Sequence, residues 1–102
     1  MIDIVVLGSL NMDLVVRTER MPRPGETLRG TEFRTIPGGK GANQAASAAR
    51  LGAQVEMVGR VGADAFGPPI IENMRNQGVG VSHVVLDPDT STGTATIVVD
   101  DD

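Results

Sequence analysis

The stretch GGKGANQAASAARLG, residues 38–52, joins a glycine-rich loop to a segment rich in alanine. The alanines favour a helix from Asn43 to Leu51, and Gly52 is typical of the position just beyond a helix end. Glycines allow backbone amides to approach a ligand closely, and a helix amino terminus adds partial positive charge. The loop is therefore a candidate binding site, with Asn43 either capping the helix or reaching the ligand. A glycine-rich turn without a ligand is the alternative.

Apolar and β-branched runs lie on both sides of this helix. Residues 2–7 form an almost continuous apolar run, which predicts a strand buried on both faces, as in a parallel sheet. Strand and helix then alternate, which predicts an α/β fold with a Rossmann-like parallel sheet and helices. Residues 14–36 interrupt the alternation as a β insertion, with which residues 94–99 could pair. The remaining predicted elements are strands at 55–61 and 81–86 and a helix from Phe66 that ends near Gly78.

Composition excludes several classes of function. The chain has 102 residues, a net charge of −4, no basic run and no cysteine. This balance disfavours a nucleic-acid partner and excludes disulfides and thiolate sites. No apolar run approaches the length of a membrane span or a signal-peptide core. His83, the only histidine, has no neighbours at ligand spacing, so we expect no metal site. We expect a cytoplasmic protein with no membrane partner.

A second candidate site follows the first predicted strand, at residues 8–13. In open α/β sheets, ligands bind beyond the carboxyl ends of strands. Asn11 and Asp13 lie two residues apart, so in an extended segment their side chains face the same way. A carboxylate that accepts and an amide that both donates and accepts suit a polyhydroxylated ligand. A simple turn is the alternative, since Asn and Asp are common in turns.

The phosphate-binding patterns of nucleotide proteins fail in this chain. A P-loop needs Lys followed by Ser or Thr, whereas Lys40 is followed by Gly41. The dinucleotide fingerprint is not met after the first strand either. Residues 59–67 form a third glycine-rich segment, in which Asp64 is predicted to cap the next helix as a structural residue.

Several blocks together resemble the ribokinase branch of the PfkB family of carbohydrate kinases. Their order and spacing match over essentially the whole chain, and the Gly-Gly-Lys-Gly-Ala-Asn-Gln block with its upstream Asn-x-Asp is highly specific. The resemblance implies the amino-terminal part of a ribokinase-like α/β domain with a small β-sheet lid, at about residues 14–36 and 93–102. The matching blocks are residues 6–13, 24–27, 38–45, 52–53, 59–64 and 91–93.

The resemblance also implies a sugar site and a reaction. Complete members of this branch phosphorylate D-ribose at O5 with ATP and Mg²⁺, with a monovalent cation such as K⁺. Their lids clasp to form a homodimer. The residues implied to bind the sugar's hydroxyls or line its pocket are Asn11, Asp13, Gly39, Lys40 and Asn43, with Ala95 and Ile97 as lid residues on its apolar face.

The chain departs from the family in length. Family members carry, in their carboxyl-terminal portion, a Gly-Ala-Gly-Asp anion hole whose Asp is the catalytic base, and this motif is absent here. We therefore expect no catalytic residue, nucleotide pocket or cation site in residues 1–102, and no phosphoryl transfer without the missing portion. Uncovered sheet edges and apolar faces should result. A non-catalytic sugar-binding or dimerisation module is the alternative, and the sugar could be ribose, another pentose or a nucleoside.

Overall fold

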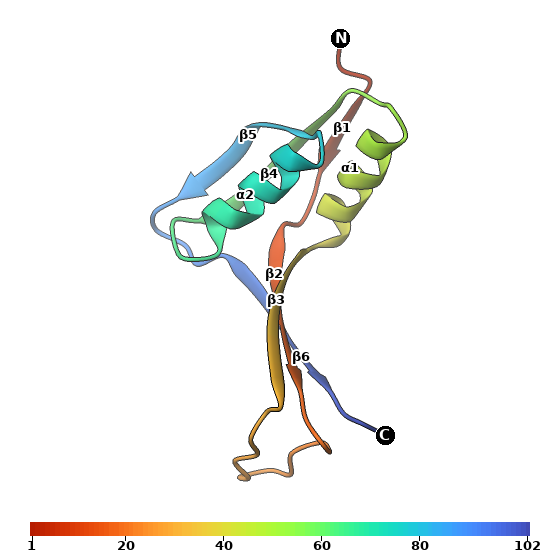
Figure 1. Ribbon diagram of the computed structural model, residues 1–102. Coiled ribbons are helices and arrows are strands. Elements are labelled where there is room, and N and C mark those ends of the chain that lie inside the picture. Colours follow the sequence, from red (N-terminus) through yellow and green to blue (C-terminus); the bar gives the residue numbers. More distant parts are fainter.

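The computed structural model describes residues 1–102 as an upper body and a narrow stalk (Figure 1). The body contains both helices, and the stalk consists of three extended strands. The elements in chain order are β1 (Ile4–Leu7), β2 (Asn11–Arg17), β3 (Glu32–Gly38), α1 (Lys40–Arg50), β4 (Val55–Gly62), α2 (Gly67–Asn76), β5 (Gly80–Asp87) and β6 (Gly93–Val99).

The body is built on a parallel sheet of strand order β1-β4-β5, which we call the body sheet. Helices α1 and α2 pack side by side on one face of this sheet (Figure 1). Small alanines let α1 lie close to the strands, and Ala45 is fully buried. Met57 of β4 is also 0% exposed and lies at the centre of the core. The mixed α/β fold with a parallel sheet confirms the fold class predicted from the sequence.

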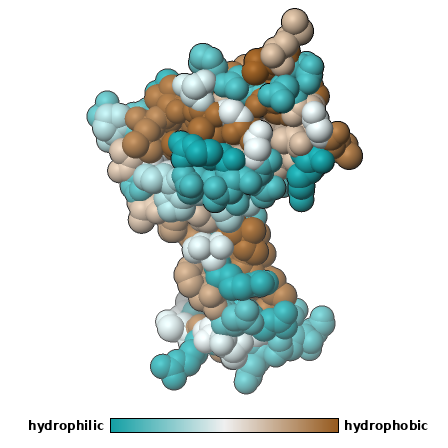
Figure 2. Space-filling model, turned by 45° about the horizontal axis from the view of Figure 1, so that its top comes forward, coloured by the Kyte–Doolittle hydropathy of each residue, from teal (hydrophilic) through white to brown (hydrophobic).

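The prediction that the first strand is buried on both faces is wrong. Val5 is 61% exposed and Leu7 is 80% exposed. The physical reason is that both helices cover the same face of the body sheet, so the opposite face stays open. Broad hydrophobic surface is visible on the body in Figure 2. The apolar residues that line the open face include Ile2, Val5, Val58 and Val85. This agrees with the expectation that apolar faces would be uncovered.

The stalk is a second sheet of order β3-β2-β6, which we call the stalk sheet. Strand β2 pairs antiparallel with β3 and parallel with β6, so the β insertion does pair with the last strand. Residues in register across the three strands share a face of the sheet. On one face the rows are Gly38–Asn11–Gly93, Ile36–Asp13–Ala95, Arg34–Val15–Ile97 and Glu32–Arg17–Val99.

The helix ends differ from the sequence prediction at their amino termini. Helix α1 begins at Lys40 rather than Asn43, and Gly39 precedes it with a φ of 104°. Asn43 therefore lies inside the helix and does not cap it. The carboxyl ends agree with the prediction, because Gly52 and Gly78 both adopt a positive φ just after α1 and α2. Neither helix is long and apolar enough to cross a bilayer.

Candidate functional site

Asn11 and Asp13 form the polar centre of the candidate site. Both lie on β2 and point to the same face of the stalk sheet, as their spacing predicts. The Asn11 amide Nδ2 donates a hydrogen bond of 2.9 Å to Asp13 Oδ1, and both residues are half-buried. This bond fixes the amide orientation. Asp13 Oδ2 and Asn11 Oδ1 make no other side-chain hydrogen bond, so two acceptors are available to a ligand with hydroxyl groups.

A close contact between two glycines brings the loop after β1 against the start of α1. A side-chain carbon at Gly41 would lie 2.8 Å from the Cα atom of Gly8, which only glycine avoids. The Ser9 carbonyl accepts a 3.0 Å hydrogen bond from the Ala42 N–H, and Ser9 Oγ accepts one of 3.4 Å from the Gly41 N–H. The two glycine-rich segments that the sequence singled out therefore meet at one place.

Gly38 and Gly39 bring the helix amino terminus beside the polar pair. A side-chain carbon at Gly38 would lie 2.9 Å from Asp13 Oδ2, and one at Gly39 would lie 3.0 Å from Asn11 Oδ1. Lys40 follows as the first residue of α1; it is exposed and takes part in none of the ion pairs. The partial positive charge of the helix terminus and the Lys40 ammonium favour electron-rich ligand atoms here.

Strand β6 supplies the apolar side of the same face. Ala95 is in register with Asp13, and Ile97 is in register with Val15 one row further along the stalk. Ile36 of β3 lies opposite Ala95, on the other side of Asp13, and is 41% exposed. The sequence analysis missed Ile36 because only the strand register places it beside Asp13.

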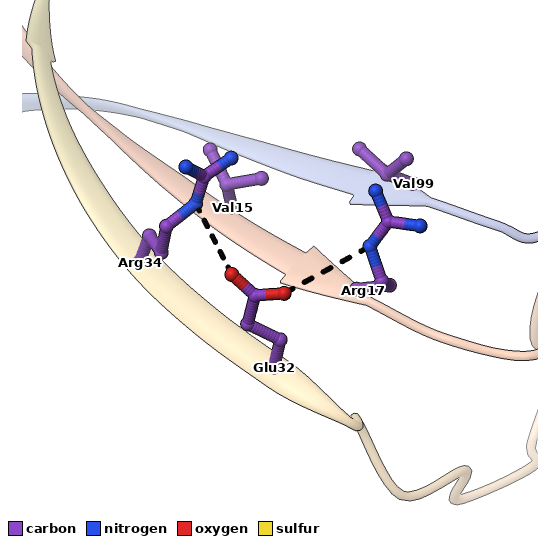
Figure 3. A pocket seen from close by; sticks show the side chains of 5 residues that line it. All are labelled: Val15, Arg17, Glu32, Arg34 and Val99. Carbon is purple, nitrogen blue, oxygen red and sulfur yellow. Dashed lines mark ion pairs between the residues drawn. The ribbon is translucent and has the colours of Figure 1, made fainter.

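Ion pairs occupy the far end of this face (Figure 3). Glu32 lies between Arg17 and Arg34, with nitrogen–oxygen distances of 4.0 and 3.5 Å. The side chains are half-exposed, so each pair contributes little stability. The ion pairs occupy the two rows that contain Val15 and Arg17, and the polar pair occupies the two rows nearer the body.

Asn43 makes no side-chain hydrogen bond to Asn11 or Asp13. It is exposed and lines a small crevice between the two helices, together with Gly38 of the stalk, Asn73 of α2 and Gln77 just after α2. The structure therefore brings Asn11, Asp13, Ala95 and Ile97 onto one face and places Gly39 and Lys40 at its rim. Asn43 lies one turn further along α1 than Lys40.

Asp64 makes more contacts than its predicted role as a helix cap requires. Phe66, not Asp64, is the residue that precedes α2, although Asp64 Oδ1 accepts hydrogen bonds from the Phe66 and Gly67 N–H groups at 3.0 and 3.1 Å. The Thr92 N–H donates to Asp64 Oδ2, and the Thr92 hydroxyl donates to Oδ1, each at 2.8 Å. These donors, with the two from Thr92 contributing most, lower the pKa of Asp64 to about 2.

No group of three or more His, Cys, Asp or Glu side chains is arranged to hold a metal ion in residues 1–102. The candidate site offers a carboxylate and an amide beside a helix terminus, flanked by small and aliphatic side chains. This chemistry suits a small polyhydroxylated ligand.

Comparison with known proteins identifies the family. All of residues 1–102 match the pfkB family of carbohydrate kinases. The ribokinase of Bacillus subtilis is 53% identical over 97 residues, which are 95% of this chain and 33% of that protein. The ribokinase of Lactococcus lactis is 48% identical over 103 residues, 100% of this chain and 34% of that protein. The structure of Arabidopsis thaliana ribokinase complexed with ribose and ATP superposes with a TM-score of 0.91 at 40% identity, covering 100% of this chain and 34% of that one.

The chain therefore belongs to the pfkB family of carbohydrate kinases. It corresponds to the amino-terminal portion of ribokinases and spans about a third of the length of the relatives it matches.

Proposed function

We propose that this chain supplies the sugar-binding part of an ATP-dependent kinase that phosphorylates D-ribose at O5. One observation carries the proposal: Asn11 and Asp13, paired at 2.9 Å, share a sheet face with Ala95 and Ile97 and adjoin the Gly39 loop. Carboxylate and amide groups would bind the sugar hydroxyls, and Ala95 and Ile97 would pack on its apolar face. Lys40 and Asn43 would complete the pocket from the first turns of α1.

The stalk sheet would act as the lid over the sugar. Residues 8–10, Gly39 and residues 88–92 connect it to the body, and Met12 of β2 also packs in the body's buried core. Strands β3 and β6 are its edges, and an exposed edge is a template for pairing with another chain. The exposed Phe33 on its other face, at 62%, supports a homodimer formed through the lids. The alternative function is a non-catalytic module that binds sugar or dimerises through this sheet.

By the complete kinase we mean a protein of the relatives' full length whose amino-terminal third has the sequence of residues 1–102. In it, the ribose O5 would attack the γ-phosphorus of ATP, ADP would leave, and a base outside residues 1–102 would take the O5 proton. ATP, Mg²⁺ and a monovalent cation such as K⁺ would bind in that remaining portion. Residues 1–102 alone would bind sugar weakly and transfer no phosphate.

The test is calorimetry and steady-state kinetics of the complete kinase with D-ribose. Asp13→Ala should weaken ribose binding by about 1–3 kcal/mol, because it leaves the Asn11 amide and the sugar hydroxyls without an acceptor. The matched control is Glu19→Ala, an exposed carboxylate at the far end of the stalk, which should bind ribose normally. An unchanged ribose KM in Asp13→Ala would refute the assigned role. Saturable ribose binding without ADP formation would favour the non-catalytic module.

A further inference from the structure

The crossing from β5 to β6 is held at both ends by side-chain hydrogen bonds. Three segments link the body and the stalk (Figure 1). The crossing after β1 passes through Gly8 and the one before α1 through Gly39, and a side-chain carbon at either position would lie within 3.0 Å of backbone atoms. The third crossing, residues 88–92, is held at its start by Asp87, which accepts hydrogen bonds from the Asp89 N–H at 2.8 Å and from Arg60 at 2.7 Å.

Thr92 anchors the far end of this crossing. Its side chain is buried, with 6% of the residue exposed, and its hydroxyl accepts a 2.9 Å hydrogen bond from the Gly62 N–H at the end of β4. The same hydroxyl donates to Asp64 Oδ1, and the Thr92 N–H donates to Asp64 Oδ2. Thr92 is thus attached to the body by three hydrogen bonds immediately before β6 begins at Gly93.

The two oxygens of Asp64 divide their partners unequally. Oδ1 serves α2 and the Thr92 hydroxyl, whereas Oδ2 accepts only from the Thr92 N–H. Capping the helix would need one oxygen. The second oxygen contacts the residue that leads into β6, so the carboxylate joins the start of α2 to the start of the stalk strand.

The register of β6 depends on this anchor. Strand β6 is an edge strand, hydrogen-bonded only to β2. A shift of one residue along β2 would turn Ala95 and Ile97 to the opposite face and present Thr94 and Thr96 instead. The position of Gly93, one residue after the anchored Thr92, sets Ala95 beside Asp13.

We infer that Asp64 and Thr92 are positioning residues for sugar binding, which hold β6 so that Ala95 and Ile97 stay on the face of Asn11 and Asp13. The inference rests on the proposed function of that face. Asp64 and Thr92 act through β6 and do not touch the sugar. Weakening their contact should therefore affect the sugar and leave the nucleotide unaffected.

The test compares Thr92→Val with Thr92→Ser in the complete kinase. Valine keeps the shape but removes the hydroxyl that bridges Gly62 and Asp64, and serine restores it. Thr92→Val should raise the ribose KM about tenfold with an unchanged ATP KM, because small misplacement of a binding group is costly. Thr92→Ser should stay close to the wild type. A ribose KM that is unchanged in Thr92→Val, or a loss only of active fraction with both KM values unchanged, would overturn the inference.

Hydrogen exchange of Asp64→Asn keeps the inference testable if Thr92→Val does not fold. Asparagine keeps one acceptor oxygen, but its NH₂ group cannot accept the hydrogen bond that the Thr92 N–H donates to Asp64 Oδ2. Amides of β6 should exchange faster while those of β4 stay protected. Equal acceleration in both strands would indicate general destabilisation and overturn the inference. A wild-type kinase that does not act on ribose would instead overturn the proposed function.

Discussion

Substitution of Gly39 by alanine should damage the sugar site directly. Gly39 has a φ of 104°, which L-residues rarely adopt, so alanine carries backbone strain of about 1–3 kcal/mol. Its new side-chain carbon would lie 2.5 Å from the Ser9 carbonyl oxygen, whereas ordinary contacts begin at 3.4 Å. The loops must therefore separate by about 0.9 Å (3.4 − 2.5), the same carbon being 3.0 Å from Asn11 Oδ1. Displacement of this size in a binding group costs roughly tenfold to a hundredfold in function.

The assay is urea unfolding and ribose calorimetry of the complete kinase, with Gly25→Ala as the matched control. Gly25 also has a positive φ, 76°, but no atom lies within 4 Å of the position its side-chain carbon would take. Gly25→Ala should lose about 1–2 kcal/mol of unfolding free energy and keep its ribose affinity. Gly39→Ala should lose both. Wild-type ribose affinity in Gly39→Ala would refute the convergence of the two loops on one ligand.

Three further predictions follow from the core, the carboxylates and the family. Met57→Ala should lower the free energy of unfolding by about 2–5 kcal/mol in urea titrations, because it empties a fully buried site; Leu51→Ala, 89% exposed, should change it by less than about 0.5 kcal/mol. The pKa of Asp64 is lowered from 3.8 to about 2, so in this pH range the folded protein binds fewer protons at Asp64 than the unfolded protein does. The contribution of Asp64 to the free energy of unfolding should therefore be complete above pH 4 and vanish between about pH 4 and 2. Asp64→Asn should flatten the pH dependence of the urea midpoint in that range. A chimera in which residues 1–102 replace the matching third of Bacillus subtilis ribokinase should phosphorylate ribose with ATP, and the same chimera with Asp13→Ala should lose that activity at moderate ribose concentration; an inactive but folded parent chimera would count against the shared sugar site.

Local pattern was sufficient to predict most of the fold. The alternation of apolar runs and helical segments predicted the three strands of the body sheet and both helices, with Gly52 and Gly78 at the helix ends, because periodicity and turn chemistry are properties of neighbouring residues. The stalk strands β2 and β3 were predicted only as one β insertion. The β1 prediction failed for a different reason. An apolar run shows that a strand can be covered on both faces, whereas the packing of α1 and α2 on a single face is a tertiary feature.

The candidate site divides in the same way. The common direction of Asn11 and Asp13 follows from strand geometry alone, so their spacing could predict it. Ile36 enters the site only through the β2–β3 register, and Asp64 meets Thr92 only because residues 28 positions apart become neighbours. No local pattern encodes either contact. Asn43 was predicted at the helix start, but α1 begins three residues earlier, at Lys40, so Asn43 lies inside the helix and lines the crevice beside α2.

A crystal structure of the complete kinase with D-ribose tests the central claim most directly. We predict that at least one ribose hydroxyl oxygen lies about 2.5–3.0 Å from a carboxylate oxygen of Asp13, the range of a hydroxyl hydrogen bond. The same ribose should contact Ala95 or Ile97 of β6. Ordered ribose at a place where it touches neither Asp13 nor Asn11 would contradict the account.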